Sequence, residues 1–261
     1  MKPRAILDHW KPFSAAWKKA KRNSRSEGVH DLRVETRRLN ASLVLLHAVS
    51  ANDRVLEVRR SFKKVRKRLG PLRDVQVERS LLRPWKSSKS VESFEKSLKR
   101  EENKQAKRVL KYLTDRRKKK LHGELKRIAS VSIPLDSEAT QERVKDSLKA
   151  AREQFDSALR TTSPDDPARL HALRIAAKTV RYMTEGAARA FGIEDAPGSD
   201  ADLKTLTTYQ TELGELRDLQ LLEENILQWS KARSPENRRE LDAVRKRLQL
   251  QRAARLKRIF R

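Results

Sequence analysis

Two rows of basic side chains, each headed by a histidine, have the residue types and the spacing to bind an anion. The rows consist of His30, Arg33 and Arg37, and of His171, Arg174, Lys178 and Arg181. An α-helix turns by about 100° per residue, so each row follows one stripe of its helix. Arginine donates paired hydrogen bonds to phosphate oxygens, lysine adds a mobile charge, and imidazole donates from one or both ring nitrogens. The pattern therefore predicts an anion-binding face on each of two helices.

The apolar residues of the same two helices fall on the side opposite the cations. They are Leu32, Leu39, Leu43 and Leu46 in the first helix, and Leu173, Val180 and Ala187 in the second. A single row of charges usually marks a solvated helix face. Because the same histidine-headed row occurs twice, we interpret it here as a functional site, whereas the run 116–120 is interpreted as solvated surface that attracts polyanions.

The chain repeats itself. The segment 30–37 matches 171–178, and the segment Leu69–Val77 matches Leu213–Leu221, in the same order. The two motifs are 40 residues apart in the first copy and 43 in the second. This indicates a tandem duplication of a helical unit of roughly 130 residues. We expect the units at residues 1–130 and 137–261, with a linker at 130–135.

The elements that position these residues are all expected to be helices, because apolar residues recur with a period of 3.6 and no strand pattern is present. The expected helices are 3–22, 28–50, 53–69, a short helix ending at 83, 91–129, 137–159, 167–191, 200–214, 215–231 and 235–260. Gly70 and Pro71 are expected to end a helix. Asp74 and Asp218, which follow the expected breaks, are predicted to cap a helix or to fix a cation.

Composition limits the partners. The 261 residues include 62 Lys and Arg against 35 Asp and Glu, for a net charge of +27, and no cysteine. The charge favours a polyanion such as nucleic acid, inorganic polyphosphate or an anionic membrane surface. Without cysteine there is no disulfide framework, Cys-based zinc site or thiol nucleophile. The apolar run 41–51 is too short to span a membrane and the N-terminus lacks an apolar signal core, so a cytoplasmic protein without membrane insertion is expected.

These residues resemble the CHAD domain, a family named for its conserved histidine and α-helical character. The resemblance rests on His30-x-x-Arg33-x-x-x-Arg37-Arg38, on His171-x-x-Arg174-x-x-x-Lys178-x-x-Arg181-Tyr182, and on the Leu-Gly-x-Leu-Arg-Asp segment of each copy. It implies an all-α fold of two pseudo-twofold-related antiparallel helical bundles, with roughly four to five helices each, around a basic central pore or groove. It also implies binding of inorganic polyphosphate and, in some members, association with polyphosphate granules.

The polyphosphate-binding residues that follow from the rows and the resemblance come from three helices and the start of a fourth. They are His30, Arg33, Arg37, Arg38, Arg60, Lys63, Lys67, His171, Arg174, Lys178, Arg181 and Lys204. Asn40 stands where the family usually has Arg, and Thr207 where it usually has Lys; Lys204, one turn earlier, is expected to compensate. The two half-sites are therefore expected to be unequal.

Two other classes of protein fit the sequence less well. A nucleic-acid-binding helical protein fits the charge, but aromatic residues are scarce and no recognised nucleic-acid motif is present. A metal-dependent hydrolase is disfavoured, because none of the five histidines are paired at helical spacing. The triphosphate-tunnel domain often fused to the family has no Glu-x-Glu-x-Lys signature here. We therefore expect a non-enzymatic protein without a cofactor or metal, which binds nucleic acid only weakly.

Overall fold

The computed structural model describes residues 5–24, 27–85, 88–130, 137–193 and 200–260, and every regular element in these segments is a helix. The all-α prediction is confirmed. The elements are α1 (Ala5–Asp8), α2 (Trp10–Arg22), α3 (Glu27–Ser50), α4 (Asp53–Leu82), the 3-10 turn η1 (Arg83–Trp85), α5 (Lys89–Tyr112), α6 (Asp115–Ala129), α7 (Glu138–Thr161), α8 (Pro167–Phe191), α9 (Asp200–Ser230) and α10 (Pro235–Ile259).

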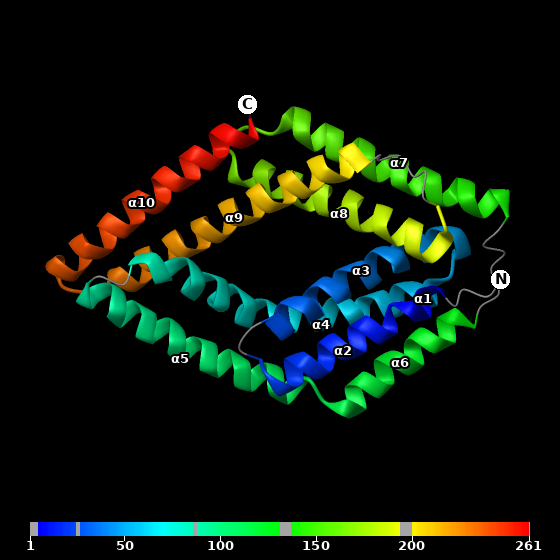
Figure 1. Cartoon of the computed structure of the whole chain (residues 1–261), viewed down its shortest axis with the longest axis horizontal. Helices are drawn as coiled ribbons and strands as arrows, with labels where there is room; N and C mark the ends of the chain where they lie inside the picture. Colours follow the sequence, from blue (N-terminus) through cyan, green and yellow to red (C-terminus); the bar gives the residue numbers. More distant parts are fainter. Residues whose placement is uncertain (1–4, 25–26, 86–87, 131–136, 194–199, 261) are drawn as a thin grey trace.

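The two halves of the chain pack their helices in the same order. In the first half α2 packs on α3, α3 on α4 and α4 on α5; in the second half α7 packs on α8, α8 on α9 and α9 on α10. Figure 1 shows the first half below and the second half above, with long helices along the outer edges. In the middle α3 packs against α8, and α4 against α9. This arrangement confirms two pseudo-twofold-related bundles.

Two hydrophobic cores hold the bundles together, and each contains residues of both halves. The larger core includes Phe13 and Phe62 together with Leu173. The smaller core, formed by α4, α5, α9 and α10, packs Phe94 with Ile226. Because neither core belongs to one half alone, the two repeats support one another. The expected boundaries of the two repeat units, 1–130 and 137–261, stay a prediction, since residues 131–136 of the linker lie outside the described residues.

Close packing of α3 on α8 depends on a small residue. A Cβ placed on Gly186 of α8 would lie 3.0 Å from the Ser42 hydroxyl and 3.4 Å from the Ser42 backbone nitrogen of α3. Gly186 therefore brings the two helix backbones together. The buried ring of His9 contacts the same serine, with its Nε2 2.9 Å from the Ser42 hydroxyl.

Four of the expected helix boundaries are wrong. The helix α4 continues through Gly70 and Pro71 to Leu82, and α9 continues through Gly214 to Ser230. Leu69 and Leu72 are fully buried on either side of the exposed Pro71, so packing of the helix outweighs the one backbone hydrogen bond that proline removes. The expected helix 91–129 is divided into α5 and α6, and the expected helix 3–22 into α1 and α2.

Candidate polyanion-binding site

The two histidine-headed rows lie on α3 and α8, the pair of helices that meet at the centre of the molecule. His30 and His171 are exposed at the beginnings of these helices, while Arg33, Arg37, Arg174 and Lys178 are half-buried. The positive charge of Arg37 on α3 lowers the pKa of both Arg174 and Lys178 on α8. Electrostatic influence of this kind requires the groups to be neighbours. The two rows therefore form one cluster of cations rather than two separate faces.

Lys178 is the most perturbed cation of the cluster. Burial and then the charges of Arg174 and Arg37 lower its pKa from 10.5 to about 7, against an opposing contribution from Asp218. The pKa of Arg33 is lowered to about 10, chiefly by burial and then by Arg37. The charged forms of Lys178 and Arg33 are therefore destabilised in the free protein, and a bound anion would offset that destabilisation.

The helices α4 and α9 add cations that the sequence-based site omitted. Arg66 and Arg73 lie on α4 and Arg217 on α9, and each changes the pKa of a group in the two rows. Arg33 also donates from Nη1 to the backbone oxygen of Arg66 at 3.4 Å. Arg73 and Arg217 occupy equivalent positions in the repeated Leu-Arg-Asp segment, and this correspondence was the signal by which the sequence could have revealed them.

Asp74 and Asp218 do not cap helices, because α4 and α9 run through them without a break. They act on cations instead. Asp218 raises the pKa of Arg174 and of Arg73, which belong to different repeats. Burial raises the pKa of both carboxyl groups, and arginine charges from both repeats oppose that rise. Of the two predicted roles, capping is wrong and fixing cations agrees with these charges.

A third carboxyl group connects α4 to α9 by a hydrogen bond. Glu78 is buried and accepts a hydrogen bond from Asn225 Nδ2 at 2.8 Å. Burial raises the pKa of Glu78 to about 7, and the charges of Asp74 and Asp218 act in the same direction. Asp74, Glu78 and Asp218 therefore all lie on α4 and α9, while the cations of the cluster come from all four helices.

A cavity of about 330 Å³ opens beside the cluster between α3, α4 and α8. The charged residues that line it are Arg37, Arg59, Lys63, Arg66 and Lys178. Its remaining wall is formed by Asn40, Ala41, Val44, Ile175, Thr179, Tyr182 and Met183. Among the described residues that line this cavity there is no carboxylate, so the charges of its lining are all positive.

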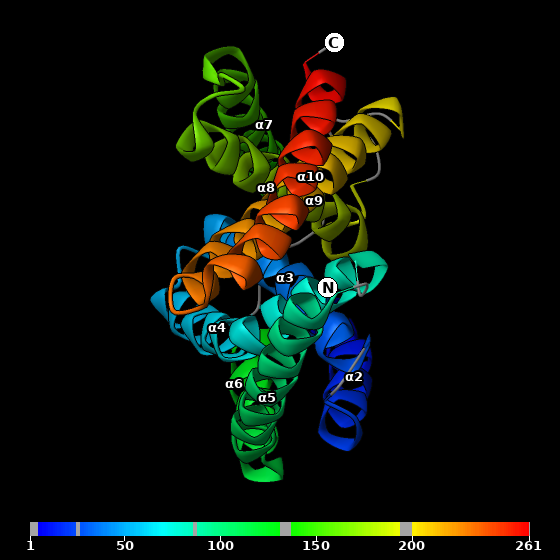
Figure 2. The ribbon, with the colours of Figure 1, turned by 90° about the vertical axis from the view of Figure 1, so that its left-hand side faces the viewer.

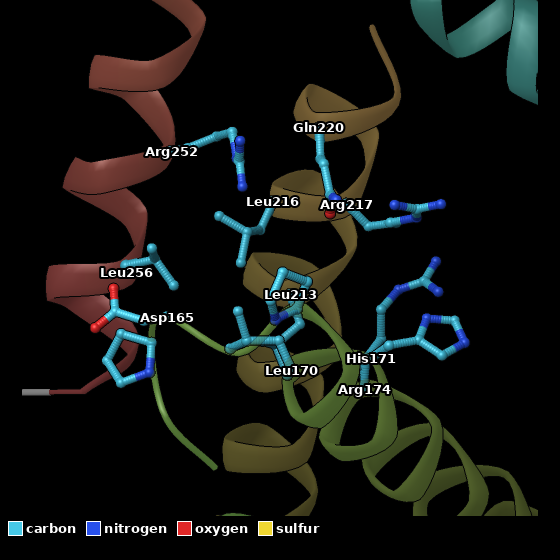
Figure 3. Close-up of a pocket in the computed structure, with 12 residues that line it drawn as sticks. Asp165, Leu170, His171, Arg174, Leu213, Leu216, Arg217, Gln220, Arg252 and Leu256 are labelled. Atoms are coloured by element: carbon cyan, nitrogen blue, oxygen red, sulfur yellow. The ribbon is translucent and has the colours of Figure 1, made fainter. Parts of the chain in front are cut away.

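A second cavity of about 230 Å³ lies where α8 meets α9 and α10. Figure 3 shows the side chains of His171, Arg174 and Arg217 projecting together from α8 and α9, on the side away from α10. Leu216 and Leu256 fill the space toward α10. The second histidine-headed row thus gains an arginine from α9 at its head.

Two predicted residues have carboxylate partners. Arg38 pairs with Glu35 at 2.7 Å and with Glu185 at 3.3 Å, and Arg181 pairs with Glu185 at 2.8 Å. One carboxylate of α8 therefore holds a guanidinium group from each repeat. This places Arg38 and Arg181 in the contact between α3 and α8 rather than in the lining of either cavity.

The other predicted cations lie further out. Arg60 and Lys67 are exposed on α4, and Lys204 is exposed near the beginning of α9. None of the three lines the two cavities described above. Asn40 is buried in the first cavity wall and donates from Nδ2 to the Thr36 backbone oxygen at 2.8 Å. Arg59, which sequence reasoning left out of the site, lines that same cavity.

Within the described segments, no group of three or more His, Asp and Glu side chains is arranged to hold a metal ion. Among the helices listed above, none combines the length and apolar character needed to cross a bilayer.

The family profile of the CHAD domain matches residues 4–214, so the chain belongs to the CHAD domain family. The fold agrees with two solved structures. The chain is similar to the crystal structure of the CHAD domain from the plant Ricinus communis, with 20% identity, a TM-score of 0.76, and coverage of 98% of this chain and 88% of that one. It is also similar to PptA from Streptomyces chartreusis, with 16% identity, a TM-score of 0.74, and coverage of 99% and 97%. No curated protein matches the sequence significantly.

Proposed function

We propose that this protein binds inorganic polyphosphate through the central cluster of cations, without catalysing a reaction. The observation that carries the proposal is the meeting of the two rows: Arg37 of one repeat and Lys178 of the other line the same cavity, and the charge of Arg37 lowers the pKa of Arg174 and Lys178. Cations are held this close only at an energetic cost. A ligand of dense, continuous negative charge reverses that cost by interacting with all of them at once.

A phosphate chain suits the residue types of the cluster. Arginine side chains donate paired hydrogen bonds to neighbouring phosphate oxygens, and Lys178 supplies a point charge. Burial and nearby cations lower the pKa of His30 and His171, so a bound polyanion is expected to raise their protonation. Binding also releases counterions, and the affinity should fall steeply with salt concentration.

Membership of the CHAD family supports polyphosphate over nucleic acid as the ligand. Of the described residues that line the cavity beside the cluster, none is a tryptophan and one is aromatic, the buried Tyr182. A site for single-stranded nucleic acid would present exposed rings on which bases stack. We propose that the protein is cytoplasmic and associates with polyphosphate granules, with nucleic acid as a weaker ligand.

The test is a titration of polyphosphate into a variant in which Arg37, Arg174 and Lys178 are replaced by Gln. A matched control removes the same charge from the exposed surface of α7 through Lys145→Gln, Lys149→Gln and Arg160→Gln. We expect the central variant to lose at least ~10-fold in affinity, since each lost charge-assisted contact is worth about 1.5–3 kcal/mol. The α7 variant should change only slightly, and circular dichroism should show helicity retained in both.

Competition with RNA at equal charge concentration decides between the ligands. We expect polyphosphate to displace RNA, and RNA to displace polyphosphate poorly. Equal affinities of the wild type and the central variant would overturn the assignment of the site. Preferential displacement of polyphosphate by RNA would overturn the choice of ligand.

A further inference from the structure

A second basic groove lies between α4 and α6, away from the central cluster. It is a cavity of about 480 Å³ whose lining includes Lys64 of α4 and Arg116, Arg117 and Lys120 of α6. The run 116–120 stood out in the sequence, but the central site does not use it. The lining also contains one acidic residue, Glu124, which lies 3.9 Å from Lys120. Four cations against one carboxylate leave the groove positive.

One of these cations is held in place before any ligand arrives. The guanidinium group of Arg117 lies 4.0 Å from the centre of the Tyr112 ring and donates to the Tyr112 backbone oxygen at 2.5 Å. The Arg117 backbone nitrogen donates to the Thr114 hydroxyl at 3.2 Å, which caps α6. Tyr112 and Thr114 themselves line the groove. The break between α5 and α6 therefore fixes a guanidinium group at the groove wall, which lowers the entropy cost of binding.

The cations of α4 connect the two sites. With about 100° per residue, Arg59, Lys63 and Arg66 lie within about 60° of one another, facing the central cavity. Lys64 lies roughly on the opposite side, facing α6. Between them, about 90° from the central face, lie Arg60 and Lys67, both exposed.

The remaining side of α4 is apolar and buried, and between residues 59 and 68 every charged residue of the helix is a cation. That buried side carries Val58, Phe62, Val65 and Leu69. Figure 2 shows α8 above α4 and α6 below it, which places the central cluster and the second groove on different sides of this helix. Arg60 and Lys67, which line neither site, form the bridge from one to the other.

We propose that the groove between α4 and α6 is a second polyphosphate subsite, which a long chain reaches from the central cluster by crossing α4 over Arg60 and Lys67. The inference rests on the proposed function. Lys64 lies about 130° around the helix from the central face, which on a helix of 10–12 Å diameter is an arc of about 12 Å, so a chain must extend well beyond the central cluster to occupy both sites. Tripolyphosphate is too short to do so. The second groove therefore makes long polyphosphate bind more tightly than short polyphosphate, through a high effective concentration.

The experiment compares tripolyphosphate with long-chain polyphosphate by titration at two salt concentrations. The groove variant carries Lys64→Gln, Arg116→Gln and Lys120→Gln, and keeps Arg117 because Arg117 stabilises the α5–α6 break. We expect its affinity for long chains to fall by about 10-fold or more, with the slope of log affinity against log salt lowered by about 2–3. Its affinity for tripolyphosphate should stay within about twofold of the wild type, as single-site binding is untouched.

Two further variants make the result specific. Replacing Arg60 and Lys67 by Gln should also weaken long-chain binding while sparing tripolyphosphate. The α7 variant at Lys145, Lys149 and Arg160 loses the same charge and should keep the wild-type preference for long chains. If the groove variant and the α7 variant show the same ratio of long-chain to short-chain affinity, the second subsite is refuted. Loss of tripolyphosphate binding in the Arg37, Arg174 and Lys178 variant tests the central site separately.

Discussion

The depressed pKa of Lys178 makes polyphosphate binding dependent on pH, in a way that one substitution isolates. In the free protein this pKa is about 7, because the side chain is desolvated and lies near Arg174 and Arg37. A bound polyanion reverses the electrostatic part of that shift and favours the charged form. Binding above pH 7 must therefore be accompanied by uptake of a proton at Lys178.

The magnitude follows from the protonated fraction. Below pH 7 Lys178 is charged, and the affinity does not depend on its protonation. At pH 9 about one molecule in a hundred carries a proton on Lys178, so binding weakens by about 100-fold relative to low pH. This holds where the pKa of Lys178 in the complex is above about 9. The Lys178→Arg variant carries a charge that is retained throughout this range. Its affinity should not show this loss.

The assay is a titration with polyphosphate at pH 6, 7, 8 and 9 and constant ionic strength, for the wild type and Lys178→Arg. Ionisation of Glu78, whose pKa is also raised to about 7, weakens binding over the same range in both proteins. The difference between the two curves therefore reports Lys178 alone. Calorimetry at pH 8 in two buffers of different ionisation enthalpy should detect a larger proton uptake by the wild type than by Lys178→Arg, since Glu78 and the histidines contribute equally in both. Parallel curves and equal proton uptake by the two proteins would refute the placement of a lysine with a lowered pKa in the site.

Two further predictions concern the scaffold. Burial lowers the pKa of His9 from 6.5 to about 4, so the stability contributed by the neutral ring is complete above pH 6.5 and falls by about 3 kcal/mol at pH 4. Urea unfolding should therefore show a greater loss of stability in acid for the wild type than for His9→Gln. Equal acid sensitivity of the two proteins would contradict this prediction. A Cβ on Gly28 would lie 2.8 Å from the backbone nitrogen of Ala20, whereas a Cβ on Gly123 would meet nothing within 4 Å. Thermal unfolding should therefore show Gly28→Ala destabilised and Gly123→Ala stabilised by up to about 1 kcal/mol, and a more stable Gly28→Ala protein would refute the close approach of α2 and α3.

The repeat was the strongest signal in the sequence, and it predicted the fold correctly because duplicated motifs at similar spacing require duplicated helices. Helix ends were harder to predict. Gly70 and Pro71 are strong local signals for a helix end, but α4 continues through them because Leu69, just before them, and Leu72, just after them, are buried in the core. The break at Thr114 was missed because the charged residues around it continue the helical pattern, although the threonine is a good N-cap residue.

The site was predictable in part. The rows on α3 and α8 could be read from residue spacing, since each lies on one helix. Lys63 of α4 was among the predicted residues and lines the cavity, but the part played by Arg59, Arg66, Arg73 and Arg217 depends on how helices cross, which spacing along one helix does not reveal. Arg38 and Arg181 continue the cationic pattern in the sequence, yet both pair with Glu185. Arg181 and Glu185 are four residues apart on α8, so their pairing could be read from the spacing, whereas the pairing of Arg38 on α3 with Glu185 on α8 is decided by tertiary structure.

The stoichiometry of tripolyphosphate binding tests most directly whether the two repeats build one site. Calorimetric titration is best carried out in the Lys64→Gln, Arg116→Gln, Lys120→Gln background, where the second groove is weakened. We predict one tripolyphosphate bound per chain, with Arg37→Gln and Arg174→Gln each weakening that same binding event. Two equivalents per chain, with each substitution abolishing one and leaving the other unchanged, would contradict the account.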